Sequence, residues 1–380
     1  MKILRVVSDL YPSVVGGIGI HAHRMSTEQA RRGHEVTVLT LNQKKLPETE
    51  FVDGYQVFRF PSYFTMCGNS FAPGLILEIM RRRKSVDIIH AHSHLFFSTN
   101  VCVLARLLHS APLVITNHGL ISASAPAWLN TLYKHTVSRV TFHIADHIIC
   151  YTDIEKENIE KLGIDPNKIT VIHNGVDITL FAPGDSEKNT YNKQILWVGR
   201  YVPGKGVEYL IEAFSQIRNK IPDAHLVLVG EGPGKNSVEE QLCELQIRSS
   251  VTLIDTIDNS ELPKMYNQSD VFVLPSIMEG VPRTLLEAMA CGVPVVTTNL
   301  SHLVDIVNGA GLVVPSKNSQ LLTDAILTIL DDESQAKLMG DLGKIKVQNQ
   351  YSWEDTVKKT LELYDSVIQN RKRGPPISQR

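Results

Sequence analysis

The stretch "DVFVLPSIMEGVPRTLLEAMACGVPVV", residues 270–296, contains the unit from which the fold can be predicted. An apolar run ends at Pro275–Ser276, a loop follows, and a helix is expected from Pro282 to about Cys291–Gly292. A second apolar run begins after Pro294. A strand, a helix and another strand in this order form a βαβ unit, in which the two strands lie parallel in one sheet.

The same alternation of apolar strands and helical segments runs through the whole chain. A polar gap, "APGDSEKNTYNKQ" at 182–194, divides the strands into two sets. Near-continuous apolar strands separated by helices indicate parallel sheets covered on both faces. We therefore expect an α/β protein with two doubly wound, Rossmann-like domains, 1–182 and 190–355. Ligands bind such sheets at the carboxyl ends of their strands, so we expect the site in a cleft between the domains. The expected strands are "ILRVVS", "EVTVLTL", "YQVFRF", "VDIIHAH", "PLVITNH", "DHIICYT" and "KITVIHNG" before the gap, and "ILWVGR", "AHLVLVGEG", "VTLID", "DVFVLPS", "PVVTTN" and "GLVVP" after it.

Length and composition exclude several classes of protein. The chain has 380 residues, of which 43% are hydrophobic and 21% charged, which is typical of two globular domains. Its formal net charge of −2 lacks the basic excess of a nucleic-acid-binding protein, so no nucleic-acid partner is expected. The five cysteines include no C-x-x-C pair, which favours reduced thiols in the cytoplasm over disulfides or a zinc site. The N-terminal apolar run is short and reaches Asp9, so we interpret it as a strand rather than a signal peptide.

Two charged stretches carry the chemistry. Glu279 and Glu287 lie eight residues apart, one in the loop and one in the helix of the first stretch, where the helix N-terminus suits a diphosphate. In "WVGRYVPGKGVEYLIEAF" (197–214), Arg200 and Lys205 follow an expected strand on a glycine-containing loop. Fixed cations at such a loop can hold phosphates without a metal ion.

The segment "VVGGIGIHAHR" matches the G-x-G-x-x-A pattern of a dinucleotide-binding turn through Gly17, Gly19 and Ala22. Two features disfavour a nicotinamide cofactor. The preceding strand ends near Val7, too far from the glycines, and no Asp or Glu follows the next strand, 35–41. A glycine-rich helix start still suits an anion, and a tight turn that needs glycine for backbone reasons alone is the alternative.

Over nearly its whole length the chain resembles the retaining glycosyltransferases of family 4, also called glycosyl transferases group 1, which have the GT-B fold. The matching segments are "GGIGIHAHRMSTEQARRGHEVTVLT", "DIIHAHS", "NHG", "KITVIHNGVD", "VGRYVPGKGVEYLIEAF", "LVLVGEGP", "DVFVLPSIMEGVPRTLLEAMACGVPVV" and "GLVVP". The E-x7-E element is the most specific of them. The resemblance also implies that a C-terminal helix, 356–372, crosses back to the N-terminal domain and leaves a tail at 373–380.

The resemblance implies a role for each site residue. Arg200 and Lys205 bind the donor diphosphate, and Glu287 holds the ribose. Glu279 lies beside the hydroxyls of the donor sugar, followed by Gly280 and Val281, and His118 faces the reacting sugar from the N-terminal domain. Gly16 and Gly17 form a loop that approaches the donor. The implied catalytic residues are His118, Glu279, Arg200 and Lys205.

The implied reaction moves a hexose from a nucleoside-diphosphate sugar, a UDP-sugar by default, to a hydroxyl of a lipid, lipid-linked or glycan acceptor with retention. The departing phosphate can accept the proton, and neither a metal nor a resident cofactor is expected. Two departures leave the donor open: Gly280-Val281-Pro282 replaces the frequent Gly-Phe-Gly, and Asp255 replaces a frequent glycine. The alternatives are a nucleotide-sugar epimerase of the same fold and a catalytically silent nucleotide-sugar-binding module.

Two further clusters leave alternatives open. His90, His92 and His94 would share one side of a continued strand, but a metal site is disfavoured because no cysteine or carboxylate completes it. The cluster Arg81–Lys84 ends an expected helix, where basic residues are favourable by themselves. Together with the apolar 128–133 stretch, it also suits peripheral docking to an anionic membrane at its cytoplasmic face.

Overall fold

The computed structural model describes residues 1–11, 17–42, 46–66, 69–108, 111–120, 125–184, 193–255, 257–279 and 282–373. The chain divides into two compact units. Unit 1 contains Met1–His173 together with Thr356–Arg380, and unit 2 contains Asn174–Asp355. The first boundary therefore lies at His173, earlier than the residue 182 expected from the polar gap.

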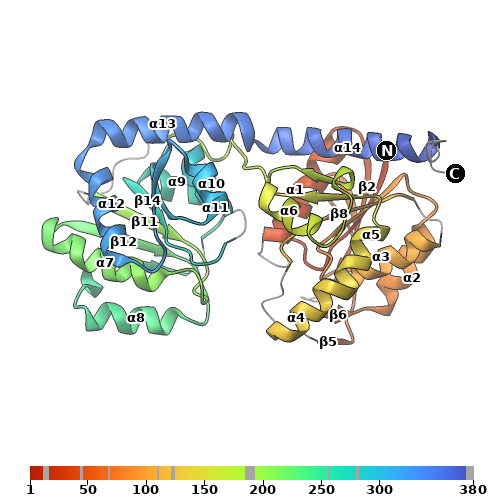
Figure 1. Cartoon of the computed structure of the whole chain (residues 1–380), viewed down its shortest axis with the longest axis horizontal. Helices are drawn as coiled ribbons and strands as arrows, with labels where there is room; N and C mark the ends of the chain where they lie inside the picture. Colours follow the sequence, from red (N-terminus) through yellow and green to blue (C-terminus); the bar gives the residue numbers. More distant parts are fainter. Residues whose placement is uncertain are drawn as a thin grey trace. The chain divides into compact units, whose positions relative to one another are not determined.

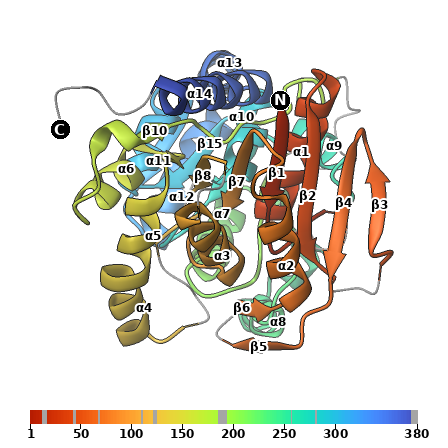
Figure 2. The same ribbon diagram turned by 90° about the vertical axis from the view of Figure 1, so that its right-hand side faces the viewer.

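Unit 1 is built on an eight-stranded sheet in the order β10-β9-β8-β7-β1-β2-β4-β3 (Figure 2). All neighbouring strands are parallel except β3, which pairs antiparallel with β4. The central strands β1 and β7 pair directly, with Arg5 opposite His90. The strands are β1 (Lys2–Val6), β2 (Glu35–Leu41), β3 (Thr49–Val52), β4 (Tyr55–Phe60), β7 (Ile88–His92), β8 (Leu113–Thr116), β9 (His147–Cys150) and β10 (Ile169–Val171).

Helices cover both faces of this sheet because its strands are apolar on both sides. Helices α2, α3, α5 and α6 pack on one face, and α1 and α14 on the other. Alternation along β1 sends Leu4 and Val6 to the first face, and Ile3 and Val7 to the second. The helices are α1 (Gly17–Arg31), α2 (Pro73–Arg82), α3 (Phe97–Leu107), α4 (Ala127–Tyr133), α5 (Arg139–Ile144), α6 (Asp153–Glu160) and α14 (Trp353–Arg373).

Unit 2 has a fully parallel six-stranded sheet in the order β13-β12-β11-β14-β15-β16. Figure 1 labels three of these strands, β12, β11 and β14. Numbered from β11, this order is 3-2-1-4-5-6, that of a dinucleotide-binding Rossmann fold. The chain reverses its direction of winding between β11 and β14, and sheets of this type bind their ligands outside the carboxyl ends of the strands at that point. The strands are β11 (Lys193–Val198), β12 (Ala224–Val229), β13 (Val251–Ile254), β14 (Val271–Leu274), β15 (Val295–Thr298) and β16 (Gly311–Val314).

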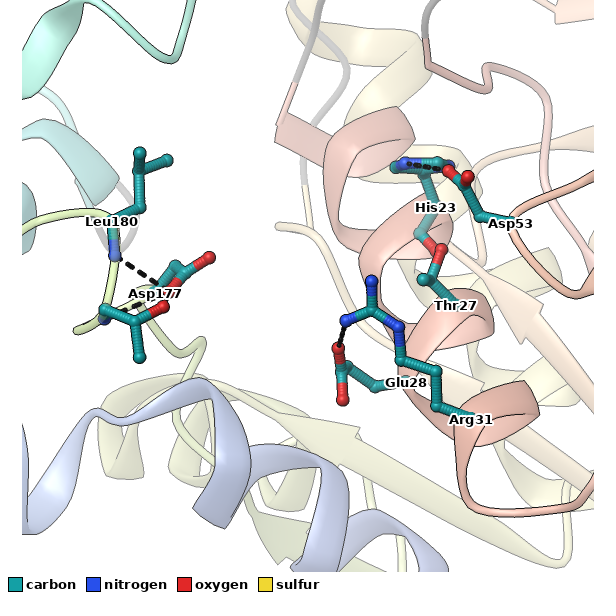
Figure 3. Close-up of polar contacts among 8 residues, drawn as sticks. His23, Thr27, Glu28, Arg31, Asp53, Asp177 and Leu180 are labelled. Atoms are coloured by element: carbon teal, nitrogen blue, oxygen red, sulfur yellow. Dashed lines mark hydrogen bonds and ion pairs between the residues drawn. The ribbon is translucent and has the colours of Figure 1, made fainter.

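The helices of unit 2 form two layers around its sheet. One core contains side chains of α7, α8 and α12, and the other contains side chains of α9, α10 and α11, with α13 contributing to both. Near the start of the unit, Asp177 accepts hydrogen bonds from the backbone N–H groups of Thr179 and Leu180, which forms a polar turn (Figure 3). The helices are α7 (Val207–Lys220), α8 (Lys235–Glu244), α9 (Leu262–Asn267), α10 (Arg283–Ala290), α11 (Ser301–Val307), α12 (Ser319–Asp331) and α13 (Glu333–Gln350).

The α/β architecture expected from the sequence is confirmed, and each of the thirteen expected apolar runs contains a strand. Three short strands were not expected: β3 and the hairpin of β5 (Phe64–Met66) and β6 (Asn69–Phe71). Their exposed or half-buried residues lack a continuous apolar run. Among the described helices, none is long and apolar enough to cross a membrane.

Candidate functional site

In unit 2, the loops after β11 and β14 carry the charged residues singled out in the sequence. The loop after β11 contains Arg200 and Lys205, and the loop after β14 contains Glu279. Since β11 and β14 are neighbours at the reversal point of the sheet, both loops lie at the same carboxyl edge.

Backbone contacts join the two loops. The N–H groups of Ile277 and Met278 donate to the carbonyl of Gly204, at 2.8 Å and 3.2 Å. Gly204 and Gly206 have positive φ angles of 91° and 67°, which favour glycine over other residues. A Cβ atom on Gly206 would lie only 2.0 Å from the carbonyl oxygen of Pro275, so glycine is also required there for close approach.

This turn directs Lys205 toward Glu279. The Lys205 Nζ atom lies 2.9 Å and 2.6 Å from the two carboxylate oxygens of Glu279. Both side chains are partly accessible, with 26% of Lys205 and 11% of Glu279 exposed. The sequence predicted both residues in the site but assigned them to different parts of a ligand, and it did not predict their ion pair.

Arg200 supplies a second cation at the same edge. Its side chain is exposed and makes no hydrogen bond or ion pair with the described residues. Helix α10 begins directly after Pro282, and its first turn contains no acidic residue, so its free N–H groups and dipole favour an anion. The described part of this edge thus presents two cations and a helix N-terminus.

Glu287 lies deeper, on α10, and is only 3% exposed. One carboxylate oxygen accepts from the hydroxyl of Tyr266 at 3.1 Å, and the other lies 3.3 Å from Arg283 Nη2. Burial and the neighbouring carboxylate raise the pKa of Tyr266 well above its ordinary value, so the tyrosine remains a donor. The i,i+4 spacing of Arg283 and Glu287 was a signal for their ion pair, whereas no local pattern pointed to Tyr266.

In unit 1, His118 follows β8 and belongs to an aromatic cluster. Its Nε2 atom lies 3.1 Å from Nδ1 of His92, and its Nδ1 atom lies 3.5 Å from the hydroxyl of Tyr151. The ring of His21, from α1, contacts His118 edge to face with centroids 5.9 Å apart. Desolvation, with His21 as a second cause, holds the pKa of His118 well below its ordinary value.

The three histidines of "HAHSH" are buried, but they do not share one face. Strand β7 ends at His92, and Ser93 has a φ angle of 63°, which turns the chain away from the strand direction. His90 and His92 stack with centroids 4.5 Å apart, whereas His94 bonds to Asn117 and contacts Phe142. The described residues contain no group of three or more metal-ligating side chains that could hold a metal ion.

The glycine-rich segment is only partly within the described residues. Gly17 begins α1, its φ angle is not positive, and a Cβ atom there would meet nothing within 4 Å. Neither strain nor crowding among the described residues therefore explains a glycine at this position. Gly16, Gly280 and Val281 lie outside the described residues, and their predicted roles stay predictions.

Comparison with known proteins points to one family over most of the chain. Residues 15–180 match the family model for Glycosyltransferase Family 4, and residues 181–346 match the model for Glycosyl transferases group 1. The chain is 28% identical to an uncharacterised glycosyltransferase of Methanocaldococcus jannaschii, in an alignment that covers 96% of this chain and 98% of the relative. It is 26% identical to a glycogen synthase of Mycobacterium tuberculosis, over 99% of this chain and 97% of the relative. The HepE protein of Anabaena, solved in complex with UDP-glucose, has a TM-score of 0.77 at 19% identity, over 96% and 100% of the two chains.

Proposed function

The chain belongs to the family 4, group 1 glycosyltransferases with the GT-B fold, and from this premise we propose that it transfers a hexose from a UDP-sugar to an acceptor hydroxyl with retention. The acceptor in this proposal is a lipid, a lipid-linked sugar or a glycan. Glycogen synthase, named among the relatives, is the observation that favours a glycan. The UDP-glucose held by HepE favours a uridine donor.

The arrangement at the edge of the unit 2 sheet carries the proposal. A nucleoside-diphosphate sugar has three recognisable parts: an anionic diphosphate, a ribose diol and a sugar. Arg200 and Lys205 are two cations at strand ends, and α10 adds its N-terminus, which together suit the diphosphate. The Glu287 carboxylate suits the diol, and Glu279 suits the sugar hydroxyls.

These residues also suit the transition state of the transfer. As the sugar leaves, negative charge grows on the diphosphate and positive charge grows at the anomeric carbon. Arg200, Lys205 and the helix dipole would stabilise the negative charge by electrostatic preorganisation. The departing phosphate would accept the proton of the acceptor hydroxyl, so the reaction needs no side-chain base. We also propose that no divalent metal takes part, because the cations of the protein supply the compensating charge.

A surface of unit 1 supports the lipid branch of the proposal. On α2, Leu77 is 71% exposed, and on α4, Trp128 is 69% exposed and Leu132 is 54% exposed. The Arg81–Lys84 cluster follows on α2 and just beyond it. Leu77 shares α2 with Arg81 and Arg82, and an apolar side chain beside cations suits an anionic lipid surface. We propose that unit 1 docks on such a surface from the cytoplasmic side, and that the exposed side chains of α4 take part in the docking.

Ion pairs with Glu78 partly neutralise the Arg81–Lys84 cluster. Glu78 pairs with both Arg81 and Arg82. The guanidinium of Arg82 also lies 4.5 Å above the ring centroid of Phe58. A free cation near an anionic membrane surface contributes about 1 kcal/mol to binding. Because two of its arginines are paired, the cluster should attract the membrane less than four free cations would.

Incubation with UDP-glucose, with and without candidate acceptors, tests the proposal. Release of UDP with a new glycosidic linkage supports a transferase. Conversion of the donor to an isomeric UDP-sugar without acceptor would support the epimerase alternative, and binding without turnover across donors and acceptors would support the silent module. A thermal-shift screen of other nucleotide sugars then identifies the donor, since a tighter ligand raises the melting temperature more.

A further inference from the structure

A chain of polar contacts runs from the interior of unit 1 to His118. It begins at Arg5, which is fully buried on β1. The guanidinium donates to Ser26 Oγ and to Gln29 Oε1 at 2.8 Å. Among the described residues, the hydrogen-bond partners of this guanidinium are Ser26, Gln29, His90 and Tyr364, so no carboxylate compensates its positive charge there.

The donors of Arg5 determine the direction of the next hydrogen bonds. A guanidinium has no acceptor, so Arg5 Nη2 donates to the hydroxyl oxygen of Tyr364 at 3.4 Å. Arg5 Nη2 also lies 3.5 Å from His90 Nδ1, so this nitrogen faces a guanidinium donor and must itself be an acceptor. The hydroxyl of Tyr364, on α14, therefore gives its single hydrogen to His90 Nδ1. His90 therefore carries its proton on Nε2, which donates to Thr116 Oγ1 at 2.7 Å. This arrangement keeps His90 neutral and fixed.

His92 connects this fixed ring to His118. It stacks on His90 at an interplanar angle of 26°, and its Nδ1 atom faces Nε2 of His118. Its own Nε2 atom is buried and has no hydrogen-bond partner among the described residues. A buried N–H group without an acceptor is more costly than an unused lone pair, so the proton of His92 belongs on Nδ1. His118 must then accept at Nε2 and carry its proton on Nδ1.

We propose that Arg5, Tyr364 and His92 are positioning residues that hold His118 neutral, with its proton on Nδ1. A second proton on His118 would place an N–H group at Nε2 opposite the N–H group of His92. The groups that face His118 and its supporting rings are His21 of α1, His90 and His92 of β7, Tyr151 after β9, Arg5 of β1 and Tyr364 of α14. None of them is an acid that would stabilise an imidazolium. Burial and the neighbouring rings and guanidinium likewise hold the pKa values of His90 and His92 well below the ordinary value.

This inference rests on the proposed function in one respect, namely the use of His118. The Nδ1–H group lies 3.5 Å from the Tyr151 hydroxyl, and in this role it would exchange that long contact for a sugar hydroxyl oxygen. As a neutral donor, it places no positive charge beside an anomeric carbon that itself becomes positive. An imidazolium would donate equally well but would oppose that charge. A neutral His118 ring therefore suits glycosyl transfer better than a charged ring does.

Nitrogen NMR of the full chain labelled at its histidine rings tests the proton arrangement without any ligand or activity. The His118 signals are identified by comparison with His118→Gln. We expect wild-type His118 to remain neutral and protonated on Nδ1 from pH 8 to pH 5. Protonation of its ring near pH 6.5, or a proton on Nε2, would overturn the inference whatever reaction the protein performs.

Variants test the chain of contacts. His92→Phe keeps a ring on His90 but removes the donor to His118, and Tyr364→Phe removes only the hydroxyl that fixes His90. In each variant, we expect His118 to populate both neutral tautomers, with the proton on Nδ1 or on Nε2. The Nε2–H tautomer should be more populated in His92→Phe than in Tyr364→Phe. Tyr55→Phe is the matched control, because its hydroxyl bonds to His23 at 2.8 Å, and His23 pairs with Asp53 rather than with the cluster (Figure 3).

The variants also separate positioning from general stability. With UDP-glucose as donor, the turnover of His92→Phe should fall by about tenfold while its KM for the donor stays within about twofold, since the ring is displaced but the unit 2 residues are untouched. Unchanged His118 signals in both folded variants would overturn the chain of contacts. If His92→Phe does not fold, Tyr364→Phe, which keeps its ring, decides the question.

Discussion

Lys205 Nζ lies within hydrogen-bond distance of both carboxylate oxygens of Glu279, at 2.9 Å and 2.6 Å. A cation expected to hold phosphate therefore has a carboxylate as its partner in this structure. A diphosphate that binds Lys205 must compete with Glu279 for the ammonium group. Once replaced, the Glu279 carboxylate is free to accept from the hydroxyls of a sugar.

Removal of either cation should slow turnover. We expect Arg200→Ala and Lys205→Ala each to lower kcat by roughly a hundredfold or more, because a preorganised charge that stabilises the leaving diphosphate is lost. Arg200 is exposed and unpartnered among the described residues, so the melting temperature of Arg200→Ala should equal that of wild type. Lys220→Ala, at the far end of α7, is the matched control for loss of a lysine. Wild-type turnover in either site variant would refute the assignment.

Glu287 and Glu279 should differ in their effect on UDP itself. Loss of a hydrogen bond that involves a charged group costs about 1.5–3 kcal/mol, so Glu287→Ala should weaken UDP binding roughly ten- to hundredfold. Glu279→Gln should bind UDP at least as tightly as wild type, because the competitor for Lys205 is neutralised, while donor turnover falls. Isothermal titration with UDP measures both. Equal affinities in Glu287→Ala and wild type would contradict the ribose role.

Tyr266 provides the control for that comparison. Tyr266→Phe removes one hydrogen bond from the Glu287 carboxylate without removing the carboxylate. We expect it to lower the melting temperature and to weaken UDP binding less than Glu287→Ala. A loss of UDP affinity as large as that of Glu287→Ala would mean that Glu287 acts through the packing of α10 and not through the nucleotide.

Activity should not require a divalent metal. Enzyme treated with EDTA should keep most of its rate, because Arg200, Lys205 and the N-terminus of α10 supply the positive charge at the diphosphate. The rate of UDP release, measured before and after the treatment, checks this. Complete loss that magnesium or manganese restores is the contrary result.

Unit 1 should lose stability as the pH falls below neutrality. Burial lowers the pKa of His94 from 6.5 to about 4, so below pH 6.5 the unfolded chain binds a proton that the folded chain does not. Its contribution is fully present above pH 6.5 and decreases by about 1.4 kcal/mol per pH unit until about pH 4. Denaturant unfolding of His94→Gln between pH 7 and pH 5 should therefore show a shallower pH dependence than wild type. Exposed His135 provides the control substitution, and an unchanged slope in His94→Gln would contradict the prediction.

Docking to anionic membranes should depend on the apolar residues of α4 as well as on the basic cluster. We expect the wild-type chain to sediment with anionic vesicles at low salt, and salt to weaken this, because charges are screened beyond about 8 Å at physiological ionic strength. Trp128→Ser with Leu132→Ser should reduce sedimentation, as should serine at 81–84. Leu338→Ser with Leu342→Ser, an exposed apolar pair on α13, is the matched control. Wild-type protein that ignores the vesicles would exclude the docking surface.

The sequence predicts the sheets well because their strands are buried on both faces, and it predicts the loops of the site because these follow the strands. It does not predict β3, whose residues are mostly exposed and which forms only by pairing with β4. It also places His94 on the same side as His92, since nothing local reveals the positive φ angle of Ser93. Local patterns therefore determine elements, while a single backbone angle determines where the next side chain points.

Hydrogen-bond partners that lie far apart in the chain could not be predicted from the sequence. Arg5 appears in an apolar strand, where a charged residue is ordinarily interpreted as solvent-facing, yet it is fully buried. Its partner Tyr364 lies 359 positions away, and Tyr266 lies 21 positions from Glu287. Such pairs depend on which helix packs on which face of the sheet, and local patterns in the sequence do not reveal this packing.

In unit 1, Tyr364 and Val367 of α14 pack into the same core cluster as side chains of β1 and α1, and they are synthesised after all of unit 2. At 5–20 residues per second, about 10 to 40 seconds of translation separate His173 from the end of this helix. During that interval this face of the sheet has α1 but lacks α14, while all of unit 2 emerges from the ribosome. The apolar side chains that pack against Tyr364 and Val367 in the folded unit should therefore stay exposed on the nascent chain until α14 has been made.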